Sequence, residues 1–286
     1  MAAVATLRGL GRELRHNRVA LAGFSITMFV LVAIAIGPSL SPYDPTAMDF
    51  TAILQPPSWA HPFGTNSFGM DVLTRVLYGA RNSLMISIAG VSLGAIAGTL
   101  IGMTSAYVGK LFDAVAMRLV DLLFAFPIFV LALMLMLILG FGVQNVIVAI
   151  ALVYIPNFAR LSRNTTMVVK SEPYVQAAQV MGQPRIRIMV REILPNIAAP
   201  LFVQFTVGLA FAIIIEAGLS FIGLGVQPPT PSLGVMMADG KDYFHRGPWV
   251  LTLTGLALMF AILGLNLLGD GLRDLLDPRL RRRAAA

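Results

Sequence analysis

Six apolar stretches, each about as long as a membrane-spanning helix, are the feature that most limits what this chain can fold into. The first covers residues 19–40 and contains no charged residue. An α-helix rises about 1.5 Å per residue and the hydrocarbon core of a bilayer is about 30 Å thick, so about 20 apolar residues cross it. The other stretches are residues 82–108, 117–139, 143–159, 197–221 and 249–268. The sequence therefore predicts an all-α, polytopic membrane protein with six transmembrane helices.

Composition and charge agree with a membrane protein. Of the 286 residues, 57% are hydrophobic and 12% are charged, and the mean hydropathy is +0.80, which is unusual for a soluble domain. The net charge of +7 is compatible with nucleic-acid binding, but cytoplasmic loops of membrane proteins also collect Lys and Arg. With the N-terminus inside, only Arg75, Arg81, Lys241 and Arg246 of the 21 Lys and Arg lie outside. We therefore expect both termini in the cytoplasm and no nucleic-acid partner.

The N-terminal segment, residues 1–18, places arginines and leucines at helical spacing, and we expect it to be a cytosolic amphipathic segment. A cleaved signal peptide is the alternative for the stretch that follows, because Ala33-Ile34-Ala35 resembles a cleavage site. The apolar run continues beyond that point, which favours an uncleaved first transmembrane helix. Residues 41–81 are rich in Pro and polar groups and predict an extracytoplasmic loop, with a helix leading inward over residues 71–81.

The second apolar stretch carries glycines at a strict four-residue spacing: Gly90, Gly94, Gly98 and Gly102. This spacing puts them on one face of a helix, where the absence of side chains allows another helix to approach closely. We therefore predict a tightly packed helix interface along this face.

Residues 171–195 form a long polar interruption between two apolar stretches. They predict two short helices that are hinged at Gly182, the first capped by Ser171 and the second ended by Pro195. Each helix has an apolar stripe; the first consists of Tyr174, Ala177, Ala178 and Met181, and the second of Ile186, Met189, Val190 and Ile193. The pattern leaves two interpretations open. The stripes lie on the membrane surface or on neighbouring helices, or they form a docking surface for a partner.

The same segment resembles a known sequence motif. Gln176-Ala177-Ala178, then Gly182, then Leu194-Pro195 is similar to the EAA loop of permease subunits of ABC importers. The chain looks most like the second permease of dipeptide- or oligopeptide-type importers, and the similarity covers nearly all of it. The supporting stretches are RHNRVALAG (15–23), HPFGTNSFGMDVLTRVLYGARNSL (61–84), Asp121 with Pro127, EAGLSFIGLG (216–225) and GDGLRDLLDPRLR (269–281).

The resemblance implies a type I ABC importer permease fold in a bacterial inner membrane. It implies a first transmembrane helix, a five-helix core over residues 82–270 that includes a coupling loop at 164–196, and a cytosolic basic tail at 271–286. The coupling helix in that loop is expected to occupy a groove of a cytosolic ATPase subunit. The residues expected to couple are Tyr174, Gln176, Ala177, Ala178, Met181, Gly182, Leu194 and Pro195.

The resemblance also implies partners: a homologous permease, two ATP-binding subunits and an external solute-binding protein. ATP and Mg²⁺ are expected in the ATP-binding subunits and no cofactor in this chain. The residues agree, because Gly109-Lys110 and Gly240-Lys241 lack the rest of a phosphate-binding loop. His16, His61 and His245 lie too far apart in sequence to suggest a metal site, and there is no cysteine. We therefore expect a transport subunit and not an enzyme.

The chain departs from the family pattern in three places. Gln176 replaces the usual glutamate of the loop, Glu192 replaces an apolar residue, and Asn66 and Met70 alter an extracytoplasmic motif. Gln176 keeps the size and hydrogen-bonding capacity of glutamate and loses its charge. This substitution puts in doubt any ion pair that the glutamate would make.

Glu216 is the one carboxylate in a strongly apolar context near the outer end of the fifth stretch. A carboxylate within a span is costly and is expected to face protein or water. It is either a pathway or gate residue, or a structural residue that bonds a neighbouring helix or loop, and the second reading is favoured. Asn145, Gln204 and Asn266 are expected to bond between helices.

Peptides are the leading substrate class, and nickel, glutathione and opine-like solutes remain alternatives because related importers carry them. Two other classes of protein fit the hydropathy pattern. A stand-alone secondary transporter or channel predicts paired broken helices and charges near the bilayer midplane, and neither is clear in the sequence. A membrane scaffold that transports nothing would also present a basic docking loop.

Overall fold

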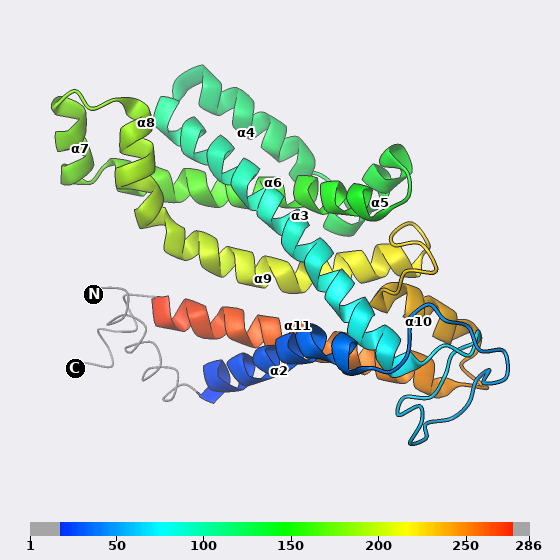
Figure 1. Cartoon of the computed structure of the whole chain (residues 1–286). Coiled ribbons are helices and arrows are strands. Elements are labelled where there is room, and N and C mark those ends of the chain that lie inside the picture. The colour runs from blue at the N-terminus through cyan, green and yellow to red at the C-terminus, as the bar shows by residue number, and fades with distance from the viewer. Residues whose placement is uncertain (1–17, 277–286) are drawn as a thin grey trace.

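Helices account for most of residues 18–276, which are the residues described by the computed structural model (Figure 1). The helices are α2 (Arg18–Leu40), α3 (Val72–Val108), α4 (Lys110–Phe124), α5 (Ile128–Leu139), α6 (Val143–Lys170), α7 (Pro173–Val180), α8 (Arg185–Ile188), the π-helix η1 (Met189–Ile193), α9 (Leu194–Phe221), α10 (Leu233–Asp242) and α11 (Pro248–Leu276). The described residues contain no β-strand, only an isolated bridge between Thr65 and Asp71. The all-α prediction is confirmed. The expected segments 1–18 and 271–286 lie mostly outside the described residues.

Five helical stretches are long and apolar enough to cross a membrane: α2, α3, α6, α11 and the continuous stretch Arg185–Phe221. Helices α4 and α5 meet the same criteria together and make a sixth, but they are bent by 94° at the break between them. The stretch predicted as the third span, residues 117–139, is therefore broken at Pro127 into two helices. Pro127 is the residue before α5, and it explains the break because proline lacks an N–H and disfavours helix at the preceding residue.

Three helix boundaries differ from the sequence expectations. Helix α3 begins at Val72, after Asp71 accepts a hydrogen bond from the Thr74 N–H at 2.8 Å, so most of the inward helix expected over residues 71–81 is the first part of α3. Helix α6 continues past residue 159 to Lys170. The helix expected to end at Pro195 does not end there, because Arg185–Phe221 is one continuous helical stretch.

The helix continues through Pro195 for a local reason. Pro195 lies in the first turn of α9, where a missing N–H is tolerated. The π-turn just before it has the wider hydrogen-bond pattern, with the Leu194 N–H donating to the Met189 carbonyl. The Asn196 side chain donates to the Glu192 carbonyl at 2.6 Å. The proline therefore follows a one-turn bulge in a helix that continues through it.

Helices α3 and α6 form the most extensive helix pair in the described residues, and the four-residue glycine repeat lies along their contact. A Cβ atom built on Gly94 would lie 2.8 Å from the Ala151 carbonyl oxygen, and one on Gly98 would lie 2.5 Å from the Ile155 carbonyl oxygen. Gly90 and Gly102 make equally close approaches to α6. In a membrane, such close van der Waals packing takes the place of the hydrophobic driving force between helices.

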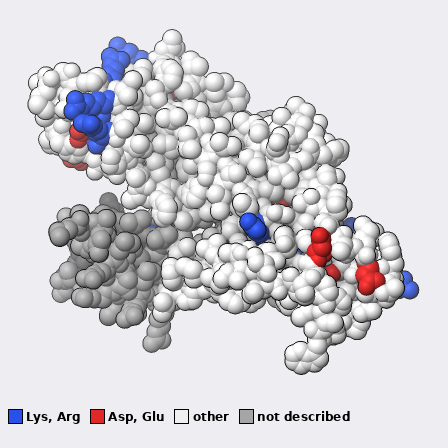
Figure 2. Space-filling model, viewed as in Figure 1, with Lys and Arg blue, Asp and Glu red and all other residues white. Residues whose placement is uncertain are grey.

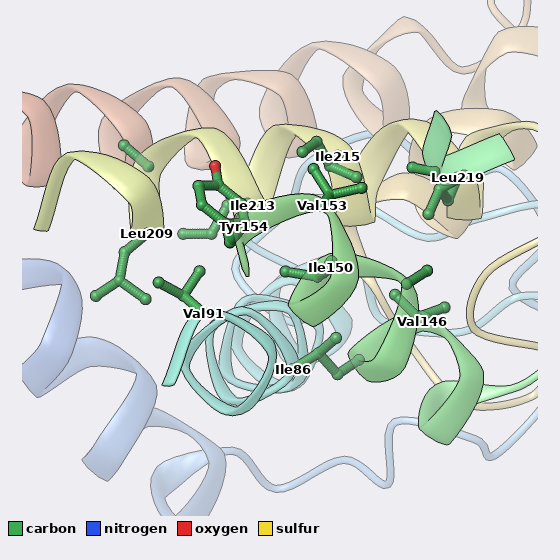
Figure 3. Packing of buried hydrophobic residues seen from close by; sticks show 14 of the residues in the cluster. Ile86, Val91, Val146, Ile150, Val153, Tyr154, Leu209, Ile213, Ile215 and Leu219 are labelled. Carbon is green, nitrogen blue, oxygen red and sulfur yellow. The ribbon is translucent and has the colours of Figure 1, made fainter. Parts of the chain in front are cut away.

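Helix α9 completes the main core by packing on both members of this pair (Figure 3). Ile86 and Val91 come from α3, and Ile150 and Tyr154 come from α6. The residues that α9 adds to the cluster are Leu209, Ile213, Ile215 and Leu219. These side chains point toward one another between the three helices, so the core lies where α3, α6 and α9 meet.

Helix α2 packs mainly on α11 through a second close contact that the sequence analysis missed. A Cβ on Gly23 would lie 2.5 Å from the backbone of Leu267, and one on Gly264 would lie 2.9 Å from the Thr27 hydroxyl. The opposite face of α2 is apolar and exposed, with Phe29 at 73% and Ile36 at 51% of full exposure. Helix α2 therefore lies at the edge of the bundle.

The α3–α6 contact predicts opposite effects for two Gly→Ala substitutions. Gly98→Ala should lower the unfolding temperature in detergent, because overpacking costs about 1–3 kcal/mol. Gly255→Ala in α11 is the control, since a Cβ there meets nothing within 4 Å, and it should leave stability unchanged or raise it through better helix propensity. Equal effects of the two substitutions would contradict the packing argument.

Candidate functional site

The expected docking segment lies at one end of the bundle. Helices α7 and α8 are at the same end as the start of α2 and the last turns of α11 (Figure 1). Lys and Arg gather over this end in Figure 2, whereas most of the Asp and Glu visible in that view lie over the opposite end. Arg185, Arg187 and Arg191 are all exposed here. The segment is therefore an exposed, basic projection of the bundle.

The first turn of α7 is arranged differently from the sequence expectation. Ser171 does not cap α7: it belongs to the end of α6, where its hydroxyl donates to the Val168 carbonyl at 2.7 Å. Glu172 is the N-cap residue and makes no side-chain cap bond. The Gln176 amide donates to the Ser171 carbonyl at 3.1 Å. A glutamate carboxylate is acceptor-only, so the departure from the family pattern at Gln176 supplies the donor for this bond.

Gly182 ends α7 in a Schellman motif. The Gln183 N–H donates to the Ala178 carbonyl at 3.1 Å, and the Gly182 N–H donates to the Gln179 carbonyl at 3.0 Å. Gly182 has a φ of 75°, a left-handed conformation that glycine adopts without the steric cost of a Cβ. The predicted hinge residue therefore has a backbone reason to be glycine.

The inner side of the segment packs against the ends of α3 and α9. Val175 and Ala178 of α7 are buried together with Ile188, Ile193 and Ile197, and Met103 of α3 completes the cluster. At the end of α3, the Lys170 ammonium donates to the carbonyls of Ala106 and Tyr107 at 3.2 and 2.9 Å. Helix α7 is thus fixed to the helix ends beneath it.

The outer side of α7 is exposed and mostly apolar, and we call it the docking face: Tyr174, Ala177, Val180, Met181 and Gly182. Val180 is 88% exposed and Met181 is 70% exposed. The predicted stripe is therefore divided, because Ala178 is only 3% exposed and packs inward while its neighbours face outward. The sequence analysis missed Val175 as a buried residue and Val180 as an exposed one. Val175 and Ala178 are three residues apart, and this spacing could have indicated that they lie on one buried face of the helix.

The second predicted stripe is divided in the same way. Ile193 is fully buried and Met189 is half-buried, whereas Ile186 and Val190 are exposed at 72% and 52%. Leu194 packs against the inner cluster, and Pro195 is exposed in the first turn of α9.

Two ion pairs hold α4 against α6 beside this segment. The Arg163 guanidinium makes two hydrogen bonds to the Asp113 carboxylate at 2.5 and 2.6 Å. Arg160 bonds Asp121 at 2.6 Å and lies 3.9 Å from the centre of the Phe124 ring. Asp121 and Pro127 are both part of the family resemblance. Asp121 ties α4 to α6, and Pro127 lies at the break between α4 and α5.

Glu216 lies inside the packing between α9 and α10. Its side chain is fully buried, and its Oε1 atom accepts a hydrogen bond from the Ser220 hydroxyl at 2.8 Å. That hydroxyl also accepts from the Val226 N–H at 3.1 Å. Oε2 has no hydrogen-bond partner among the described residues. Asn145, expected to bond between helices, donates to the Leu139 carbonyl at 2.7 Å and so closes the end of α5.

The end of the bundle opposite α7 carries a cavity of about 720 Å³ between the α2–α3 loop (residues 41–71), α3 and α10. Asn66 and Ser67 donate to the Asp239 carboxylate at 3.1 and 2.6 Å. Arg75 is 4% exposed and donates to the Pro45 carbonyl at 2.5 Å. Asn66, a departure from the family motif, therefore ties the loop to α10. The described residues contain no group of three or more His, Cys, Asp or Glu placed to hold a metal ion.

Comparison with known families matches almost the whole chain. Residues 73–282 match the model of the binding-protein-dependent transport system inner membrane component. Residues 7–57 match the N-terminal transmembrane domain of oligopeptide transport permease C.

Similar proteins include several named permeases. The chain is 38% identical to the di/tripeptide transport system permease protein DppC of Pseudomonas aeruginosa (strain UCBPP-PA14), over 97% of this chain and 94% of that protein. It is 41% identical to a putative peptide transport system permease protein of Brucella abortus biovar 1 (strain 9-941), over 94% and 91%. It is 38% identical to the glutathione transport system permease protein GsiD of Escherichia coli O1:K1 / APEC, over 94% and 89%.

A solved structure of the inward-facing MetNI methionine ABC transporter supports the fold. Its matching chain superposes with a TM-score of 0.56 at 18% identity, and the match covers 71% of this chain and 97% of that one. The fold, the span pattern and these similarities agree. The chain therefore belongs to the family of binding-protein-dependent transport system inner membrane components, as a permease subunit of an ABC importer whose ATP hydrolysis takes place in separate subunits.

Proposed function

We propose that this chain forms half of a translocation pathway for short peptides, and that its docking face transmits the state of cytosolic ATP-binding subunits to α9. The observation that carries the proposal is the two-sided build of α7. Its inner side is buried in an apolar cluster shared with α8, η1 and the ends of α3 and α9, while its outer side exposes apolar residues beside three arginines. An exposed apolar patch with a polar rim is typical of a protein-binding site.

The proposed assembly contains a homologous permease, two ATP-binding subunits and a solute-binding protein, with ATP and Mg²⁺ bound by the ATP-binding subunits. The basic α7 end faces the cytoplasm, and both termini lie on that side. The distribution of Lys and Arg supports this orientation, because cytoplasmic segments are enriched in both residues. The cavity near Asp239 and Arg75 then opens on the outer side of the membrane.

Motion at the docking face reaches the membrane through rigid connections. The buried cluster joins α7 to α8, η1 and the start of α9. The helical stretch Arg185–Phe221 then runs from the cytosolic segment into the fifth span. A displacement of α7 by the ATP-binding subunits therefore carries the end of α9 with it. The 94° break between α4 and α5 lies outside this connection.

Short peptides are the proposed substrate because two of the similar permeases are named for di/tripeptide and peptide transport. Glutathione is the second candidate, because the chain is 38% identical to the GsiD permease, the same value as for the DppC permease of Pseudomonas aeruginosa. Binding measurements on the solute-binding protein that works with this chain distinguish the two. Nanomolar to micromolar binding of dipeptides without binding of glutathione supports the first substrate, and the reverse supports the second.

The two-sided build predicts different effects for neighbouring alanines. Ala177→Arg should leave the thermal stability of the permease unchanged and weaken binding to the ATP-binding subunits roughly a hundredfold, because an unpaired charge buried in an interface costs about 3 kcal/mol. Ala178→Arg should lower the stability itself, since Ala178 packs inside the chain.

Co-purification and thermal unfolding of both variants measure these effects. Normal association and normal ATP-dependent transport by the Ala177→Arg protein would contradict the docking proposal. They would show that the ATP-binding subunits bind this permease at a surface other than the docking face.

Gln176 gives a second prediction. Gln176→Glu removes the donor to the Ser171 carbonyl, a bond worth about 1 kcal/mol, so the amide hydrogens of α7 should exchange with solvent about fivefold faster. Gln179→Glu is the control, because Gln179 is exposed and makes no side-chain hydrogen bond among the described residues. Hydrogen–deuterium exchange measures both variants. Unchanged exchange in Gln176→Glu, or equal acceleration in the two, would show that this bond does not hold α7.

A further inference from the structure

The tip of the α2–α3 loop exposes an aromatic side chain that the transport mechanism does not use. Trp59 is fully exposed, and Phe50 and Ile53 near it in sequence are exposed at 69% and 46%. Residues 50–60 contain no ionisable side chain. Tryptophan is on average a largely buried residue, so a fully exposed indole in an uncharged segment indicates a contact surface.

The tip lies at the end of the first span. Trp59 shares a lateral cavity of about 370 Å³ with Leu40 and Pro42 at the end of α2 and with Leu77 of α3. Leu40 itself is 76% exposed. In Figure 1 part of the loop extends past α2 on the side away from α9. The indole is therefore beside the bundle, at the depth where the apolar face of α2 ends.

The position of the tip is fixed by hydrogen bonds within the loop and by one hydrogen bond from α11. The Tyr43 hydroxyl donates to the Ala60 carbonyl at 2.9 Å, next to Trp59. The Thr65 N–H donates to the Gln55 carbonyl at 3.0 Å, and the Trp249 indole of α11 donates to the Thr65 carbonyl at 3.1 Å. The exposure of Trp59 is thus a property of an ordered loop that is tied to α11.

We propose that the tip around Trp59 rests in the lipid headgroup layer beside α2 and anchors this loop to the bilayer surface. Indole rings prefer the headgroup level, where an apolar ring and a polar N–H are both accommodated. The exposed apolar face of α2, which includes Phe29 and Ile36, leads directly to this level. The absence of charge in residues 50–60 favours a lipid surface over a steered protein partner.

The anchor has a structural consequence for the same end of the bundle. Asp71 begins α3, Asp239 of α10 accepts from Asn66 and Ser67, and Trp249 of α11 donates to Thr65. A loop held at the headgroup level therefore fixes the depth of the outer ends of three helices. This inference needs only insertion in a membrane and is independent of the proposed substrate and partners.

Fluorescence quenching tests the anchor directly, because the chain contains only 2 tryptophans. The unsubstituted chain and Trp59→Phe both keep the Trp249 hydrogen bond to Thr65, so the difference in their emission isolates Trp59. Both are reconstituted in nanodiscs of ordinary lipid or of lipid brominated near the headgroup end of the acyl chains. We expect the headgroup-proximal bromines to reduce Trp59 emission roughly twofold, because indoles sit at that depth. Lipids brominated near the chain ends should quench less.

A matched variant moves the indole of position 59 elsewhere on the same loop. Phe68 lines the cavity between the loop and α10, so Trp59→Phe with Phe68→Trp should show no more quenching by either lipid than Trp59→Phe alone, and its added indole should remain accessible to acrylamide. Trp59 emission that is unaffected by brominated lipid would overturn the proposal and assign the tip to solvent or a protein partner. Equal quenching at positions 59 and 68 would also contradict a specific contact of Trp59 with lipid.

Discussion

Close contact between the backbones of α3 and α6 is the constraint on which the rest of this structure depends. At Gly98 a single added methyl group would come within 2.5 Å of a carbonyl oxygen of α6. Because the two helices lie so close, α9 can pack on both of them and form one core. The same contact continues to the α7 end, where Lys170 of α6 bonds the last carbonyls of α3.

The segment that contains α7 and α8 packs at one end of the bundle formed by α3, α6 and α9. Val175 and Ala178 are buried in one apolar cluster with Ile188 of α8, Ile193 of η1, Ile197 of α9 and Met103 of α3. The packing of Val175 and Ala178 decides which side of α7 faces outward, and therefore which side chains are available to a partner. The basic residues around the face then set its electrostatic character. The coupling role proposed for this permease therefore follows from packing at least as much as from the loop motif.

Several features could be predicted from the sequence because they depend on local pattern. The apolar stretches gave the helical class, and the four-residue glycine spacing indicated a close contact for α3. Gly182 is predictable as the break between two helices, and the structure supplies the reason, a left-handed backbone with φ of 75°. The predictions that failed concern features set by packing between segments that are distant in sequence, where the local pattern allows more than one arrangement. Ala177 and Ala178 are chemically identical, and only the position of α3 and α9 decides which is buried.

Prolines also show that the local sequence predicts some features and not others. Pro127 breaks a span and Pro195 does not, although both interrupt apolar or amphipathic sequence. The difference lies in the preceding turn, where the π-turn ahead of Pro195 shifts the hydrogen-bond pattern. Composition cannot distinguish these cases. Glu216 is fully buried and accepts a hydrogen bond from Ser220, and its role as a gate or a structural residue stays a prediction.

The central claim is that α7 and α9 move as one body, and a pair of distances measured by spin labelling tests it most directly. The chain contains no cysteine, so labels at Gln179→Cys, outside the docking face, and Phe202→Cys report on α7 and α9 alone. On ATP binding by the assembled importer, we expect an unchanged distance between positions 179 and 202 and a changed distance from position 202 to a label on the neighbouring permease. A shift between positions 179 and 202, with position 202 fixed relative to that permease, would contradict the proposal.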